Sequence, residues 1–182
     1  MAVVVQKMVN AKASGVAITM NPGTGDRSKI TIDASYGVGE MVVSGQVTPD
    51  NIVLDKVMMT IISEHIGDKH AELVPDPASQ GLVEREVEPE RANRRCLTDA
   101  EVVLVGQMAK NAEKHYKCPQ DVEWALDHDL PDGQNLLLLQ SRPETIHSSK
   151  PTAKPVAKPA GTGFSFGNLS ALAGAAKGAA DT

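Results

Sequence analysis

Apolar and polar residues alternate along short stretches of the first third of the chain, which is the pattern of half-buried β-strands. In the stretch 29–35, Ile30 and Ile32 are expected on one side of a strand, and Thr31 and Asp33 on the other. Runs rich in apolar residues predict further strands, at residues 2–9, 15–20 and 51–56. Polar residues within the first run indicate that this strand is partly exposed.

A helical period begins at Thr98. Thr98 and Glu101 have the spacing of a capping box, in which each side chain accepts a hydrogen bond from a free amide of the first turn. Apolar residues then recur every three or four positions as far as Tyr116, and Pro119 lies just past the end. The pattern predicts one long amphipathic helix.

Two apolar runs follow this helix, at residues 122–125 and 136–139, and a loop rich in Asp, Pro and Gly separates them. This pattern predicts a hairpin with a long loop. The polar stretch 64–94 before the helix is either a surface excursion or a pair of edge strands. The elements together predict an α+β fold, with a mixed or antiparallel sheet and packed helices.

The composition changes near Ser148. Lys-Pro pairs recur in residues 149–159, which favours an extended, semi-rigid linker. Beyond it lie Phe164 and Phe166, the only phenylalanines of the chain, and an Ala-rich stretch. This tail is either a disordered end or a docking peptide that buries both rings on a partner. We expect a body at residues 1–147 and a Lys-Pro linker with an Ala-rich tail at residues 148–182.

Charge and composition exclude several classes of protein. The net charge of −5 argues against a general nucleic-acid binder, since phosphate neutralisation needs clustered Lys and Arg. No apolar run is long enough to span a membrane, and the N-terminus lacks the pattern of a signal peptide. Two cysteines make no disulfide framework. We therefore expect a cytoplasmic protein that binds neither nucleic acid nor membranes.

Four polar residues of the predicted hairpin have matching spacing. Asp121 and Glu123 lie two apart on one strand, and Gln140 and Arg142 lie two apart on the other, so pairing of the strands places all four on one face. Carboxylate and amide oxygens suit Mg²⁺, and an arginine fork suits phosphate. The face is therefore either a metal–nucleotide site or a solvated surface with cross-strand ion pairs.

Other candidate features carry less information. The Gly37–Glu40 segment either lets backbone amides approach an anion or is a plain turn. None of the five histidines has the spacing of a zinc ligand or of a nucleophilic triad.

Ordered motifs along the chain resemble the pyruvate phosphate dikinase and phosphoenolpyruvate synthase family. The resemblance runs over about residues 2–147 and covers the second half of that family's ATP-binding region, which implies an ATP-grasp-like subdomain. The motifs that carry it are Val4–Val9, Ala13–Pro22, Gly37–Glu40 with Val43–Asp50, Pro119–Ala125 and Leu139–Thr145.

The resemblance implies ATP and Mg²⁺ as cofactors and a role for each matched residue. The hinge strand that lies along adenine corresponds to Gln6, Lys7, Met8 and Val9, although the family often has Glu in place of Lys7. The polar residues match those near the metal and the phosphates. The implied metal ligands are Asp121, Glu123 and Gln140, the implied catalytic residues are Glu123 and Arg142, and Gln140 and Arg142 also contact the nucleotide.

Enzymes of this family transfer the β-phosphoryl group of ATP to a mobile histidine and then to an acceptor, leaving AMP and phosphate. The sequence shows neither the family's first ATP-grasp subdomain nor its phosphohistidine domain. We therefore expect a split phosphotransferase subunit whose protein partner carries both and which is inactive alone. The acceptor is pyruvate, or a phenol as in phenylphosphate synthase, a relative built from separate subunits. The alternative is a degenerate, non-catalytic module that binds nucleotide or only a partner.

Overall fold

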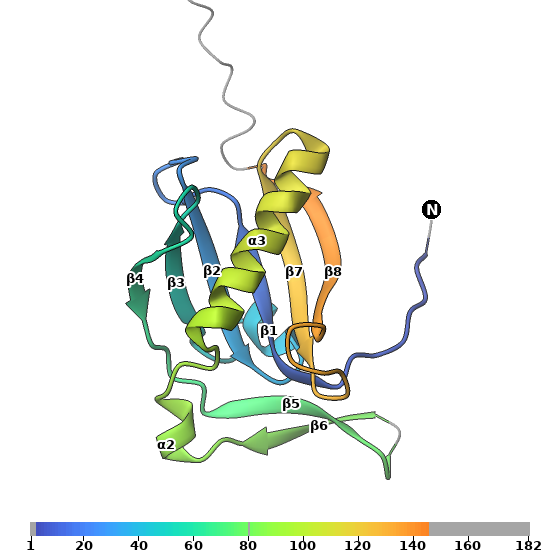
Figure 1. Cartoon of the computed structure of the whole chain (residues 1–182). Helices are drawn as coiled ribbons and strands as arrows, with labels where there is room; N and C mark the ends of the chain where they lie inside the picture. The colour runs from blue at the N-terminus through green and yellow to red at the C-terminus, as the bar shows by residue number, and fades with distance from the viewer. Residues whose placement is uncertain (1–2, 80, 146–182) are drawn as a thin grey trace, which may run out of the picture. The chain divides into compact units, whose positions relative to one another are not determined.

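Six strands form one antiparallel sheet in the order β4-β3-β2-β1-β7-β8, as Figure 1 shows. The structure is a computed structural model that describes residues 3–79 and 81–145. A separate antiparallel hairpin contains the remaining two described strands. The strands of the sheet are β1 (Ala11–Ile18), β2 (Lys29–Tyr36), β3 (Asp50–Asp55), β4 (Ile61–His65), β7 (Gln120–Asp127) and β8 (Leu136–Pro143), and those of the hairpin are β5 (Ala71–Asp76) and β6 (Gly81–Glu86).

One long helix, α3 (Asp99–Tyr116), lies across one face of the sheet (Figure 1). Strand alternation turns the apolar residues of four strands toward this helix. Gly106 of α3 permits a close approach, because a Cβ there would lie 2.5 Å from Leu54 Cδ1. Fully buried residues of this core include Ile30, Ile32, Ile52, Leu54, Val102, Val105, Val122, Trp124 and Leu126.

The predicted start of the helix is confirmed. The Thr98 hydroxyl accepts a hydrogen bond from the Glu101 amide at 3.3 Å, and the Glu101 carboxylate accepts one from the Thr98 amide at 2.7 Å. Lys117 closes the helix in a left-handed conformation with φ 60°. Two single-turn helices, α1 (Glu40–Val43) and α2 (Pro89–Ala92), were not predicted.

Most predicted strands are confirmed. The alternating stretch forms β2, residues 50–55 form β3, and the two apolar runs after α3 pair as β7 and β8. Part of the polar stretch forms the β5–β6 pair, which was one of its two predicted alternatives. The strand predicted at residues 15–20 is β1, which runs from Ala11 to Ile18; its start was missed because Ala11 and Ala13 are not β-branched and give no strand pattern.

The strand predicted at residues 2–9 is wrong for the part that the structure describes. Residues 3–10 belong to no strand, and Val4 and Val5 are among the most exposed apolar residues. Strand propensity needs a neighbouring backbone to complete the ladder. In the described ranges, no strand pairs with residues 3–10, and only Asn10 of this segment hydrogen-bonds to another segment, at His128 and Asp129.

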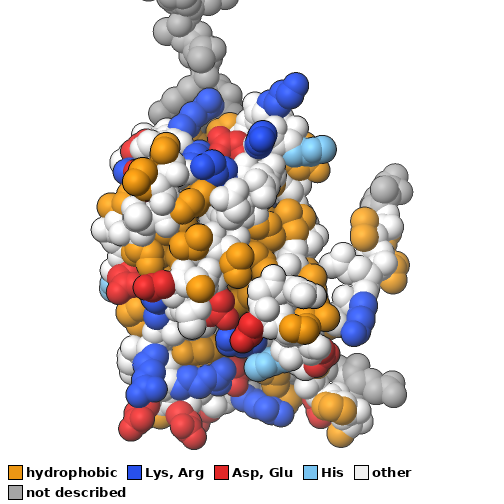
Figure 2. Space-filling view, in the orientation of Figure 1, with side chains coloured by type: hydrophobic (Ala, Val, Ile, Leu, Met, Phe, Trp, Pro, Cys, Tyr) orange, Lys and Arg blue, Asp and Glu red, His pale blue; other side chains and the backbone are white. Residues whose placement is uncertain are grey.

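The predicted linker and tail, with Phe164 and Phe166, lie outside the described residues. Within the described part of the chain, no helix is both long and apolar enough to cross a membrane. Figure 2 shows side chains of both charges gathered at the end of the body where β5, β6 and α2 lie. The charged side chains of this end include Glu84, Arg85, Glu86, Glu90 and Arg91.

Candidate nucleotide site

The sheet face opposite α3 carries the four polar residues that the sequence singles out. In the register of β7 and β8, Asp121 lies opposite Arg142, and Glu123 lies opposite Gln140. A β-bulge follows directly, between Glu123 and Trp124. The predicted pairing of these strands is confirmed, and all four side chains share one face because directly opposed residues point to the same side.

Their contacts differ in strength. The Nε of Arg142 donates to Asp121 Oδ2 at 2.8 Å, and this hydrogen bond raises the pKa of Arg142. The second carboxylate oxygen of Asp121 is buried and has no hydrogen-bond partner among the described residues. Gln140 reaches Glu123 only at 3.5 Å, and Glu123 forms no ion pair within the described part of the chain. The ion-pair interpretation therefore accounts for Asp121 and Arg142 but not for Glu123.

The predicted hinge residues line a cavity of about 160 Å³. Residues 6–9 form one wall of this hinge cavity, although they are not in a strand. Ser14 also lines this cavity and donates from its hydroxyl to the carbonyl of Gly37 at 2.5 Å. The lining comprises Gln6, Lys7, Met8, Val9, Ala11, Ser14, Val38, Gly39, Ala125 and Leu139, and most of it is apolar, as a purine ring requires.

A second cavity, of about 480 Å³, adjoins the first and contains Glu123 in its wall. Both cavities are lined by Val38, Gly39 and Leu139, so the two share a boundary. The hinge segment lines the first of these two adjoining cavities and Glu123 lines the second, and we refer to the two cavities together as the hollow. Asp121, Gln140 and Arg142 line neither cavity, but lie beside Glu123 on the same two strands.

Two residues of the Gly37–Gly39 turn, Val38 and Gly39, line both cavities. Gly37 has φ +69°, a conformation that favours glycine. The Gly37 amide donates to the Lys12 carbonyl at 3.3 Å, and the Val38 amide donates to the Leu73 carbonyl at 2.8 Å. Because these two amides already have protein acceptors, the plain-turn interpretation holds for them, and the turn acts here as a wall.

The donor set fits Mg²⁺. Asp121, Glu123 and Gln140 offer only oxygen ligands from carboxylates and an amide, and one Asp121 oxygen is buried without a partner. In the described ranges, no group of three or more His, Cys, Asp or Glu residues is placed to hold a metal ion by itself. Magnesium in nucleotide sites typically has one or two carboxylate ligands and takes phosphate oxygens as others, which matches this face.

The sequence pattern did not predict several of the residues that line the cavities. Ser14 and Leu139 lie within matched motifs, but nothing in their residue type marked them as lining. The buried Trp124, the only tryptophan of the chain, also borders the second cavity. Only the strand register, including the bulge, shows which of these residues face the hollow.

Comparison with known proteins agrees with the resemblance. Residues 1–160 match the family described as pyruvate phosphate dikinase, AMP/ATP-binding domain. The phosphoenolpyruvate synthase of Pyrococcus furiosus is 42% identical over 156 residues, which are 83% of this chain and 19% of that protein. The probable phosphoenolpyruvate synthase of Archaeoglobus fulgidus is 42% identical over 154 residues, 84% of this chain and 19% of that protein.

A third relative, the uncharacterized phosphotransferase YvkC of Bacillus subtilis, is 38% identical over 156 residues, 85% of this chain and 18% of that protein. The chain thus spans about a fifth of the length of the curated relatives that it matches. The chain belongs to the pyruvate phosphate dikinase AMP/ATP-binding family.

Proposed function

We propose that this chain supplies the adenine and metal side of an ATP site in a phosphoenolpyruvate synthase-like phosphotransferase, with an ATP-grasp-like arrangement. The observation that carries the proposal is the pair of adjoining cavities, one lined by residues 6–9 and the other by Glu123. A nucleotide has an apolar, flat base at one end and charged phosphates at the other, and this hollow has the same polarity.

The backbone of the hinge segment, residues 6–9, forms the hydrogen bonds that recognise adenine in this proposal. No backbone hydrogen bond joins residues 6–9 to another described residue, so their amides and carbonyls are available to the edge of adenine. The apolar side chains of Met8 and Ala125 lie in the same cavity, where they contact the faces of the ring. Lys7, where the family often has Glu, brings a positive charge to this wall.

The polar residues at and beside Glu123 bind the metal ion and the phosphates in this proposal. Asp121, Glu123 and Gln140 would hold Mg²⁺, which when bound neutralises phosphate charge and orients the phosphates. Arg142 uses only its Nε on Asp121, so its two terminal nitrogens remain available to a phosphate oxygen. In phosphoryl transfer such positioned charges stabilise the transition state and are the main catalytic contribution.

The acceptor of the phosphoryl group is a histidine on a partner domain in this proposal. The described residues supply one side of the site, so the partner contributes the phosphate-cradling side and the phosphohistidine. The matched relatives named phosphoenolpyruvate synthases favour pyruvate as the final acceptor, with a phenol as the other candidate.

Photolabelling with 8-azido-ATP in the presence of Mg²⁺ tests the proposal on the full chain. The azide lies on the purine, so the label is expected on the tryptic peptides that contain residues 6–9, which end at Lys7 and Lys12. Excess ATP should prevent the labelling, and excess inorganic phosphate should not. Label that survives competition by ATP, or that lies on peptides away from the hinge cavity, would contradict the proposal and favour a module that binds only a partner.

A further inference from the structure

The Gly37–Gly39 turn, whose residues Val38 and Gly39 line both cavities, depends on strand β5 for its position. The Val38 amide donates to the Leu73 carbonyl of β5 at 2.8 Å, and Gly37 forms an isolated bridge with Leu73. A Cβ on Gly37 would lie 2.4 Å from the Leu73 carbonyl oxygen, so the two backbones are in close contact. A displacement of β5 therefore moves the wall that both cavities share.

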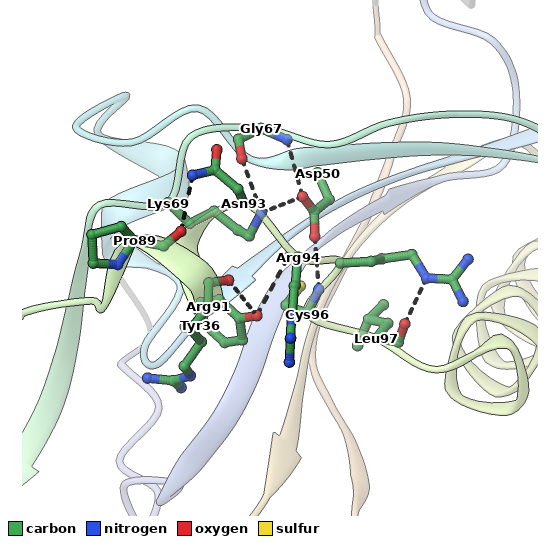
Figure 3. A network of polar contacts seen from close by, with 11 residues as sticks. Tyr36, Asp50, Gly67, Lys69, Pro89, Arg91, Asn93, Arg94, Cys96 and Leu97 are labelled. Carbon is green, nitrogen blue, oxygen red and sulfur yellow. Dashed lines mark hydrogen bonds and ion pairs between the residues drawn. The ribbon is translucent and has the colours of Figure 1, made fainter.

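Strand β5 is not part of the six-stranded sheet, and side-chain contacts hold it in addition to the backbone bond from Val38. The guanidinium of Arg91, in α2, donates to both carboxylate oxygens of Glu72 in β5, at 2.8 and 3.0 Å. The same guanidinium lies over the ring of Tyr36, 4.0 Å from its centroid. The Tyr36 hydroxyl donates to the Arg91 carbonyl at 3.0 Å, as Figure 3 shows.

The two partners of Arg91 are adjacent in sequence to the contact between the turn and β5. Tyr36 immediately precedes Gly37, and Glu72 immediately precedes Leu73. Arg91 thus connects the two residues that lie next to the contact between the turn and β5. Arginine pairs with a carboxylate through a planar fork and stacks flat on an aromatic ring, whereas lysine is a point charge that lacks this planar fork.

A buried ion pair fixes the base of the same hairpin. The Asp50 carboxylate accepts hydrogen bonds from the Lys69 ammonium, from the Gly67 amide at 3.0 Å and from the Cys96 amide at 2.8 Å (Figure 3). Both charged side chains are fully buried. A buried pair of this kind is not by itself evidence of added stability, because both charges lose their hydration. This one joins the start of β3 to the segments before β5 and before α3.

We propose that Arg91 and Glu72 are positioning residues, which set the shape of the nucleotide hollow by holding β5 against the Gly37–Gly39 turn. The inference rests on the proposed function for its consequence, but its physical basis is independent of it. Neither residue lines either cavity, so neither contacts the nucleotide in this account.

Arg91→Met in the full chain tests the inference, with Arg95→Met as the matched control. Arg95 is also a paired arginine, but it is bonded to Glu64 of β4 and to the Leu97 carbonyl before α3. The first readout is amide hydrogen exchange. In Arg91→Met, the Val38 amide should exchange about tenfold faster, because local opening of its bond to Leu73 becomes easier. Amides between β1 and β7 should exchange at the wild-type rate.

The second readout is the affinity for Mg²⁺-ATP, followed by NMR titration. Arg91→Met should weaken binding several-fold, on the order of the effect of a displaced positioning group, and Arg95→Met should not. Arg91→Lys should fall between wild type and Arg91→Met in both readouts, since it retains the charge but loses the fork.

Equal Val38 exchange in the Arg91→Met and Arg95→Met variants would overturn the inference. So would a uniform acceleration of all amides, which indicates a merely structural role. If the wild-type chain itself does not bind Mg²⁺-ATP, the proposed function is wrong. The exchange rate of the Val38 amide still tests whether Arg91 holds the turn.

Discussion

Arg142 Nε lies 2.8 Å from Asp121 Oδ2, across the β7–β8 pair. The contact orients the guanidinium on the open face, and the side chain of Arg142 remains more than half exposed. Pairs with this exposure contribute only about 0–1 kcal/mol to stability. The pair therefore contributes little to the stability of the sheet.

Arg142→Ala should weaken binding of Mg²⁺-ATP by roughly three- to tenfold, since a charge-assisted hydrogen bond to phosphate is lost, and should leave adenosine binding unchanged. Titrations with both ligands measure this difference. In the assembled enzyme, the same change should abolish AMP formation. Lys29→Ala, which removes the cross-strand pair with Asp55, is the control. Equal losses for ATP and adenosine would place Arg142 outside the phosphate site.

Glu123→Gln should remove metal binding while the fold persists. Glu123 forms only a 3.5 Å contact with Gln140, so its replacement should change the free energy of unfolding by no more than about 0.5 kcal/mol. With Mn²⁺-ATP in place of Mg²⁺-ATP, paramagnetic broadening is expected at residues 121, 123 and 140 of wild type and should be lost in the variant. Undiminished broadening in Glu123→Gln would show that the metal lies elsewhere.

Lys69→Met should destabilise the fold by about 3–5 kcal/mol, because it leaves the Asp50 carboxylate buried without its cation. Adding Asp50→Asn to Lys69→Met should recover part of this loss, since no uncompensated charge remains. Urea unfolding of both variants measures the two costs. A cost below about 1 kcal/mol for the single variant would contradict the expectation that Lys69→Met leaves an uncompensated buried charge at Asp50.

The free energy of unfolding should depend on the ionisation of Asp55 at acid pH. Hydrogen bonds from the amides of Met58 and Val57 hold the pKa of Asp55 below its usual value. Its stabilisation is therefore complete above the unfolded pKa of about 3.9 and is lost as the pH falls through the lower folded pKa. Asp55→Asn retains an acceptor that does not titrate. The advantage of wild type over this variant, measured by urea unfolding, should be larger at about pH 6 than at about pH 3; a constant difference would contradict the assignment.

Local patterns predicted those parts of the fold whose causes are local. The capping box at Thr98 and Glu101 and the alternation in β2 depend on residues a few positions apart, so the sequence alone predicted them. The face shared by Asp121, Glu123, Gln140 and Arg142 was predictable because a hairpin constrains the register of its own strands.

Contacts between distant segments were not predictable in this way. The hinge segment was predicted as a strand from its valines, but it has no described pairing partner, and propensity cannot show whether one exists. Nothing in the sequence indicated that Asp50 and Lys69 form an ion pair, since their burial depends on how the β5–β6 hairpin folds against β3. The two cavities likewise arise from the Gly37–Gly39 turn meeting the hinge, which only the three-dimensional arrangement shows.

The claim that residues 6–9 and Glu123 lie at two ends of one nucleotide site is tested most directly by NMR titration of the full chain with millimolar Mg²⁺-ATP. Weak binding in fast exchange is expected, with amide shifts at residues 6–9, at Val38 and Gly39, and at Glu123. Adenosine should shift the first two groups but not Glu123. Submicromolar affinity of the chain alone, or shifts that omit the hinge or Glu123, would contradict this claim.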